Sequence, residues 1–144
     1  MNPDQSGVRQ PGPITVKSND DLSAARSRLV QLGALSGALV ATLPTDDTPN
    51  ALAILHEGGV SLAAVDVEPF NPPKAFRVRL KGTCNPGDQL VLADPSTAAD
   101  KGKLRALPAA AGTYKLRAIA LEAGVDGQLL ECLPAGPASI TVSG

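Results

Sequence analysis

The sequence predicts an all-β protein, built as a small β-barrel or sandwich of short antiparallel strands. From residue 34 onward, short apolar runs bounded by turn residues recur every 8–12 residues or so, which is typical of sandwiches and barrels. The 144 residues include 14 Gly and 13 Pro, and that many turn residues favour short strands over long helices. With only two Phe, one Tyr and no Trp, the core has to be built from Ala, Leu and Val. We find no fixed-period repeat.

The first segment is expected to be an extended N-terminal arm over residues 1–17, followed by a single β-barrel domain over residues 18–144. Residues 1–13 contain five Gly or Pro residues and only Val8 as a sizeable apolar residue after Met1. Such a segment buries too little apolar surface to order itself without a partner. At the end of this arm, residues 14–17 (ITVK) are expected to form a short strand.

Residues 18–33 fit two structures. Leu22, Ala25, Leu29 and Leu32 have helical spacing, and Gly33 suits a helix C-terminus. The alternation over residues 28–32 instead suits a strand. We favour a loop or helical turn over 20–26 and a strand over 27–32.

The strands expected after this point are 38–43, 51–55, 60–68, 75–81, 88–93, 103–107, 113–121, 127–133 and 138–143. The turn at 85–88 (NPGD) has a type II signature, because Pro86 presets φ at the first central position and Gly87 accepts a positive φ at the second. The tripeptide VDG at 125–127 predicts another tight reversal before the strand at 127–133.

Composition excludes several function classes. The chain has 13 basic and 14 acidic residues, so a general affinity for nucleic acid or anionic membranes is not expected. Three aromatic residues supply almost no base-stacking platform. No window approaches the roughly 18 apolar residues that span a bilayer. We expect no signal peptide, and therefore a soluble protein that is made in the cytoplasm.

The cysteines, Cys84 and Cys132, are too few for a disulfide-rich scaffold. We interpret them as buried, reduced thiols, although a pair between them is also compatible with the sequence.

The clearest local pattern is residues 75–81, where Phe76, Val78 and Leu80 alternate with basic residues. A half-buried strand with a basic outer face is expected, formed by Arg77, Arg79 and Lys81. Residues 114–117 repeat the pattern, with Lys115 and Arg117 on the outer side. Residues 1–72 carry 4 basic and 8 acidic side chains, and residues 73–144 carry 9 and 6. The basic face is either an ordinary solvated sheet surface or a patch that docks on an acidic partner.

No catalytic, metal or cofactor site is expected. His56 lies beside Glu57, but a lone His at a strand end is more often structural than catalytic. The aspartates of the loops at 44–50 and 94–102 are better explained as turn formers than as Ca²⁺ ligands. Cys84 has no nearby His, and the sequence contains no phosphate-binding, dinucleotide-binding, metalloprotease or hydrolase motif. We therefore expect that the protein is not an enzyme.

Three stretches carry a resemblance to a known family: LSAARSRLVQL (22–32) leading to LPTDDTPNALAILHEGG (43–59), then 76–108, then 114–134. They contain a Val/Leu strand after a GD turn, a loop with GK before the next strand, a strand ending in AIALEA and a final DG-x-L strand. This pattern resembles the small β-barrel capsid decoration proteins, also called cement or head-stabilising proteins, of tailed bacteriophages.

The resemblance implies a structural protein of the virion that binds the outer surface of the major capsid protein shell and stabilises it. It also implies a homo-oligomer, with a trimer favoured, and no enzymatic activity or cofactor. The partner-binding residues expected on this basis lie in the arm and on the basic face: Val8, Arg9, Pro11, Pro13, Ile14, Arg77, Arg79 and Lys81. The alternative is a soluble host β-barrel that binds a small ligand or regulates another protein.

Overall fold

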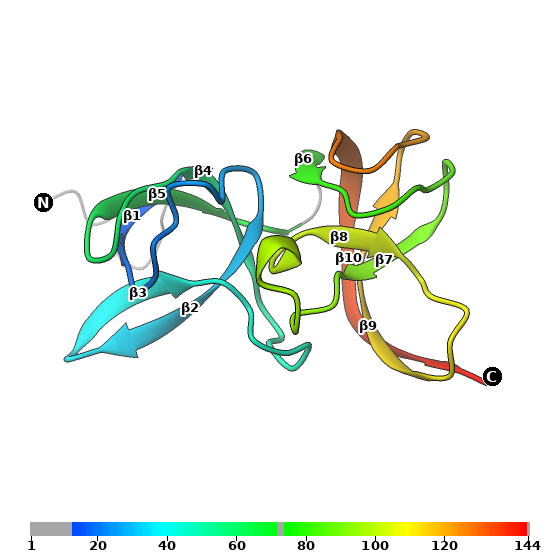
Figure 1. Ribbon diagram of the computed structural model, residues 1–144, viewed down its shortest axis with the longest axis horizontal. Coiled ribbons are helices and arrows are strands. Elements are labelled where there is room, and N and C mark those ends of the chain that lie inside the picture. Colours follow the sequence, from blue (N-terminus) through cyan, green and yellow to red (C-terminus); the bar gives the residue numbers. More distant parts are fainter. Residues whose placement is uncertain (1–12, 72–73, 144) are drawn as a thin grey trace, which may run out of the picture.

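The computed structural model describes residues 13–71 and 74–143, and it confirms the all-β class. The strands form two groups that lie side by side along the long axis (Figure 1). The first is a closed barrel in the order β1-β3-β2-β4-β5, and the second is a five-stranded sheet in the order β6-β10-β9-β7-β8. The barrel strands are β1 (Ile14–Ser18), β2 (Leu29–Leu35), β3 (Ala38–Thr42), β4 (Ala53–Glu57) and β5 (Ala64–Pro69). The sheet strands are β6 (Phe76–Arg79), β7 (Gln89–Leu92), β8 (Leu104–Ala106), β9 (Gly112–Ala120) and β10 (Leu129–Val142), with a 3₁₀ helix η2 (Ala98–Asp100) before β8.

Residues 14–17 correct the predicted boundary of the arm. They belong to β1, which pairs antiparallel with β5 through Ile14 and Val67 and parallel with β3 through Lys17 and Val40. Val16 is buried in the barrel. The strand is therefore part of the barrel wall rather than of an arm, because removing it would open the barrel between β3 and β5. Residues 1–12 lie outside the described residues.

Two other expectations differ in detail. The runs 127–133 and 138–143 form one strand, β10, because its pairing with β9 resumes after an irregularity between Pro134 and Ala138. The Gly and Pro residues there produce a bulge rather than a turn. Residues 60–63, expected at the start of a strand, instead form a turn closed by a hydrogen bond from Ala63 N to Val60 O. The loop before β2 and the positive φ of Gly87 agree with the sequence.

Two apolar clusters fill the molecule, and β2 and β4 contribute to both. Val30, Ala53 and Leu55 point into the barrel, whereas Leu29 and Ile54 point towards the second sheet. Side chains alternate between the two faces of a strand, so a strand with both faces buried has to be apolar at every position. This explains the uninterrupted apolar run from Leu52 to Leu55, all of which are buried.

The backbone of residues 27–29 joins the two groups of strands. Ser27 N donates to Leu55 O in the barrel, and Ser27 O accepts from Arg79 N in the second sheet. Leu29 N then donates to Gly102 O at 2.7 Å. The same three residues therefore hydrogen-bond to both groups.

The loops at 80–88 and 121–128 make reciprocal hydrogen bonds. Gly87 N donates to Ala120 O and Gly127 N donates to Leu80 O, both at 2.8 Å. Between them, Cys84 and Gly124 exchange two backbone hydrogen bonds. The two loops are thus related by a local pseudo-twofold arrangement, although the sequence shows no fixed-period repeat.

Both cysteines are free and buried, in agreement with the sequence. Burial raises the pKa of Cys132 to about 12 and also raises the pKa of Cys84. Because the reactive form of cysteine is the thiolate, both side chains are poorly reactive in the folded protein.

The backbone segment 27–29 forms the junction between the barrel and the second sheet. Gly102 is the position where a side chain would most directly disturb this junction. It has a φ of +81°, and a Cβ built there would overlap the backbone oxygen of Leu29. We expect Gly102→Ala to lower the free energy of unfolding by about 3 kcal/mol, because it adds a backbone clash to left-handed strain. Urea unfolding measures the change.

The matched control is Gly82→Ala, which has nearly the same φ (+78°) but no atom within 4 Å of the added Cβ. It should cost about 1 kcal/mol, the price of the left-handed backbone alone. Equal losses for the two variants would mean that the contact between Gly102 and Leu29 does not constrain the fold.

Candidate partner-binding surface

Strand β6 carries the predicted basic face, and the structure confirms that the inner side of this segment is buried. Phe76, Val78 and Leu80 are all buried. On the outer side, Arg77 is 64% exposed, and its Nη2 lies 3.8 Å from Glu131 Oε2 on β10. Arg79 donates from Nη1 to Gly127 O at 2.8 Å. The two arginines therefore differ: Arg79 is held by the loop at 121–128, whereas Arg77 extends into solvent.

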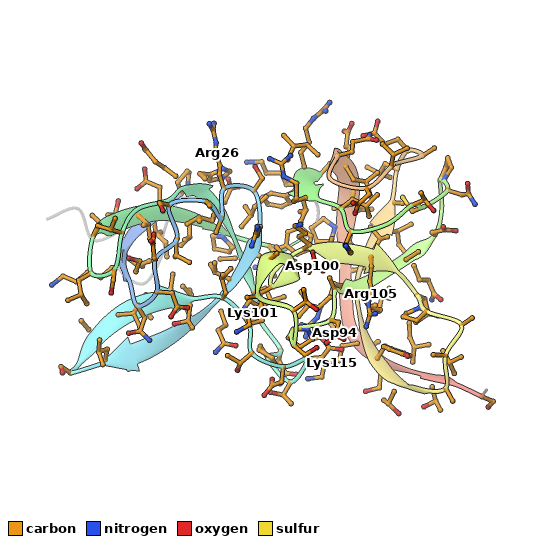
Figure 2. All side chains as sticks on the ribbon, in the orientation of Figure 1. Arg26, Asp94, Asp100, Lys101, Arg105 and Lys115 are labelled. Atoms are coloured by element: carbon orange, nitrogen blue, oxygen red, sulfur yellow. The ribbon has the colours of Figure 1, made fainter. Side chains whose placement is uncertain are left out.

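Lys81 belongs to a larger charged group around Asp100 at the end of η2. The Nζ atoms of Lys81 and Lys103 lie 3.6 Å and 3.2 Å from the two carboxylate oxygens of Asp100. Arg28 joins this group from the barrel side and donates to Lys101 O. Figure 2 shows Asp100 and Lys101 in the middle of the molecule, where η2 meets the barrel.

The charge around Asp100 is predominantly positive. Burial lowers the pKa of the Arg28 guanidinium, the nearby Asp100 carboxylate opposes that shift, and the charge of Arg79 adds to it. Arg28 and Arg79 are therefore close enough to repel each other, although they come from different groups of strands. We define the basic surface as Arg28, Arg77, Arg79, Lys81, Lys101 and Lys103.

The other strand with alternating charge, β9, does not add to this surface. Arg117 is only 4% exposed, which corrects the expectation that it lies on an open face. Its Nη2 lies 2.9 Å from Asp47 Oδ1, and Asp47 Oδ2 accepts from Lys115 N at 3.0 Å. The loop at 44–50 covers this face of β9, so these basic side chains hold that loop in place.

His56 pairs with Glu68 rather than with its sequence neighbour Glu57. The carboxylate of Glu68 is buried and lies 2.8 Å from His56 Nε2 and 2.6 Å from Lys74 Nζ. Burial by itself raises the pKa of Glu68, but the hydrogen bonds from Lys74 and His56 outweigh it, so the pKa lies below its usual value. This arrangement links β4, β5 and the segment that leads to β6, which is a structural role.

The loop aspartates also have structural roles. Asp46 Oδ1 accepts from Thr48 N, and Asp94 Oδ1 accepts from Ser96 N, both at 2.9 Å. These are Asx turns, as the sequence suggested.

The predicted arm residues are only partly described. Val8, Arg9 and Pro11 lie outside the described residues. Pro13 is exposed just before β1, and Ile14 packs against the interior cluster of the barrel. Ile14 is thus a structural residue rather than an exposed contact.

Sequence reasoning missed Arg28 and Lys101 as members of the basic surface. They lie far from β6 along the chain and reach it only because residues 27–29 and η2 meet at the junction. The turn residues before Arg28 and the residues around Lys101 give no signal for that meeting.

The hollows found on the described part of the chain are small or open. The one beside Arg117, bounded by Asn71 and Pro134, has a volume of about 30 Å³, which is room for about one water molecule. Nε of Arg117 is buried there without a hydrogen-bond partner among the described residues. Within 13–71 and 74–143, no three His, Cys, Asp or Glu side chains are grouped to hold a metal ion. The described residues include no helix with the length and apolar character needed to cross a membrane.

Comparison with known proteins gives a likeness in fold. Neither a protein-family model nor a curated protein sequence matches the chain. Among solved structures, the chain is similar to the N base of the head fibre protein gp8.5 of bacteriophage phi29, with a TM-score of 0.66. The alignment covers 88% of this chain and 95% of that one, at 14% sequence identity. This establishes a shared fold across nearly the whole of both chains.

The buried Glu68 gives a pH-dependent prediction. A carboxylate whose pKa is lowered on folding stabilises the protein above its unfolded value, and that contribution is lost as the pH falls through the folded value. We expect Glu68→Gln to lower the free energy of unfolding by about 2 kcal/mol at pH 7, because two charged hydrogen bonds are weakened. The difference from wild type should shrink below pH 4.5, the usual pKa of a glutamate.

Urea unfolding of both proteins from pH 7 to pH 3 measures this difference. Glu57→Gln, which removes an exposed carboxylate from the neighbouring strand β4, serves as the control and should change little at any pH. A Glu68→Gln loss that stays constant down to pH 3 would contradict the role given to the ionised carboxylate.

Proposed function

We propose that this protein is a capsid decoration protein of a tailed bacteriophage. In this proposal it binds the outer surface of the major capsid protein shell, stabilises the shell and has no enzymatic activity. It is made in the host cytoplasm and ends on the virion surface as a homo-oligomer, a trimer by the family resemblance.

The observation that carries the proposal is the likeness in fold to the phi29 head fibre N base, a protein whose own description places it on a phage head. That likeness spans 95% of the other chain, so it does not rest on one shared hairpin. It is independent of the turn and strand motifs that resemble decoration proteins in the sequence. Two separate observations therefore point to the head of a phage.

The basic surface supports an electrostatic contact with the shell. Arg77 is exposed, and its Nη2 lies as far as 3.8 Å from the Glu131 carboxylate, so a partner carboxylate can approach it. An acidic shell surface is the complementary partner. Contacts of this kind can each be weak, because many copies on one shell reinforce one another when they also touch each other. Residues 1–13 would extend this contact onto the shell or a sister subunit.

Density-gradient sedimentation of particles purified from the source tests the proposal directly. A band of 14.6 kDa, identified by mass spectrometry, should sediment with the major shell protein at high copy number. Recovery of the chain only as a small free protein at the top of the gradient would rule out the decoration role.

The basic surface is tested by adding purified protein to particles that lack it. Arg77→Glu should reduce the amount bound at least tenfold, because it places a carboxylate against an acidic surface. Binding of the wild type should also weaken as salt is raised. The amount bound is measured by quantitative gel analysis of the particle fraction.

Lys17→Glu is the matched control, since it makes the same charge change at an exposed position of β1. It should bind like the wild type. If both variants bind normally, the shell is held through a different surface.

A further inference from the structure

The hairpin formed by the ends of β2 and β3 extends beyond its neighbours in the barrel. Pairing of β2 with β4 involves Leu29 and Val30, and pairing of β3 with β1 involves Val40 and Ala41. Residues 31–39 continue past these points as a two-stranded ribbon (Figure 1), held by pairs such as Leu35 with Ala38. Both outer edges of the ribbon beyond those pairs are left without a strand partner among the described residues.

This ribbon is apolar and exposed. Leu35 and Leu39 are 43% and 49% exposed, and Leu32 is 38% exposed. From residue 29 to residue 45 the chain contains no charged side chain. Natural sheet edges are usually protected by lysine, proline or a bulge, and residues 31–39 contain neither lysine nor proline.

The other strand edges among residues 13–71 and 74–143 are either closed or polar. The barrel returns on itself through β1 and β5. In the second sheet, the outer strands meet at a bridge between Leu80 and Leu104, with Lys81 N donating to Leu104 O at 2.8 Å. The end of the β9–β10 ribbon is exposed but carries polar residues, including Thr113, Ser139 and Thr141. The β2–β3 hairpin therefore stands out because its exposed ribbon is both apolar and uncharged.

We propose that the β2–β3 hairpin, residues 31–39, is a contact between copies of this chain, lying close to the symmetry axis of a homo-oligomer. A rotation axis brings each residue near it against the same residue of another copy. Any charge near the axis would therefore meet a like charge, whereas an uncharged apolar segment meets a matching one. The 17 residues from 29 to 45 fulfil that requirement.

The size of the hairpin sets the strength of the contact. Nine residues per copy is well below the 20–30 residues that each partner contributes to a standard stable interface. The hairpin alone therefore gives reversible association that depends on concentration. This inference rests on the homo-oligomeric state in the proposed function and names the segment that forms it, but it does not require shell binding.

The test measures the mass of the purified full-length protein, without particles, by sedimentation velocity up to about 1 mM, a range that covers weak interfaces. The wild type should form a dimer or trimer. The double variant Leu35→Glu and Leu39→Glu should be a monomer, since it places like charges at the axis. Both side chains are exposed, so the melting temperature should stay close to that of the wild type.

Val60→Glu is the matched control, because Val60 is 62% exposed in the loop before β5 and lies outside the hairpin. It should retain the wild-type mass. An independent measurement uses Leu35→Cys and Val60→Cys with a short bis-maleimide; only Leu35→Cys should give cross-linked oligomers. The native cysteines are buried and do not compete.

Each result decides the proposal. A wild type that is monomeric throughout overturns both the hairpin contact and the homo-oligomeric state. A wild-type oligomer that persists unchanged in the folded Leu35→Glu and Leu39→Glu variant overturns the hairpin contact alone. Efficient cross-linking through Val60→Cys but not Leu35→Cys would place the interface elsewhere on the barrel. Whether particles are coated is measured separately, so failure of shell binding is distinguishable from failure of self-association.

Discussion

The arrangement of the molecule depends on the short backbone segment at residues 27–29. This segment is hydrogen-bonded to β4 on one side and to Arg79 and Gly102 on the other. Backbone groups buried at such a junction have to be paired, because an unpaired buried donor or acceptor is costly. The positive φ of Ser27 and of Gly102 lets the chain present those groups in both directions. These backbone hydrogen bonds fix the barrel and the second sheet relative to each other without any contribution from side chains.

The side chains around this junction then act in two layers. Leu29 and Ile54 fill the space towards the second sheet, together with Phe76 and Leu80. Outside that apolar layer, Lys81 and Lys103 pair with Asp100, which partly neutralises them. The basic surface thus arises from the junction itself. It combines Arg28 of the barrel side with residues of the second sheet, so neither group of strands provides it alone.

The sequence predicted the strands well because their patterns are local. The alternation at residues 75–81 and the type II turn at 85–88 are both decided by neighbours within a few residues. Arg117 shows that local patterns do not predict burial by a distant loop. Its spacing in β9 indicates an exposed face, but the loop at 44–50 covers that face and provides Asp47 as the partner of Arg117. Ile14 shows the same limit: its strand was expected, but whether the strand closes a barrel depends on β3 and β5. Arg28 and Lys101 could not be predicted as members of the basic surface for the same reason, since they meet the other members only through the fold.

The exposed surfaces of the molecule are chemically distinct, and that separation has a physical consequence. The basic surface suits a charged partner that differs from this chain, because copies of one basic surface repel each other. The β2–β3 hairpin has the opposite property: it carries no charge to attract such a partner and no charge to repel a second copy.

A protein that has to bind a large particle and also touch its own copies needs both kinds of surface, and it needs them on different elements. Here one lies at the junction around Asp100 and the other at the far end of the barrel (Figure 1). Charges in the hairpin would oppose the proposed contact between copies, and that contact would account for a 17-residue stretch without a charged side chain in a chain that is 19% charged.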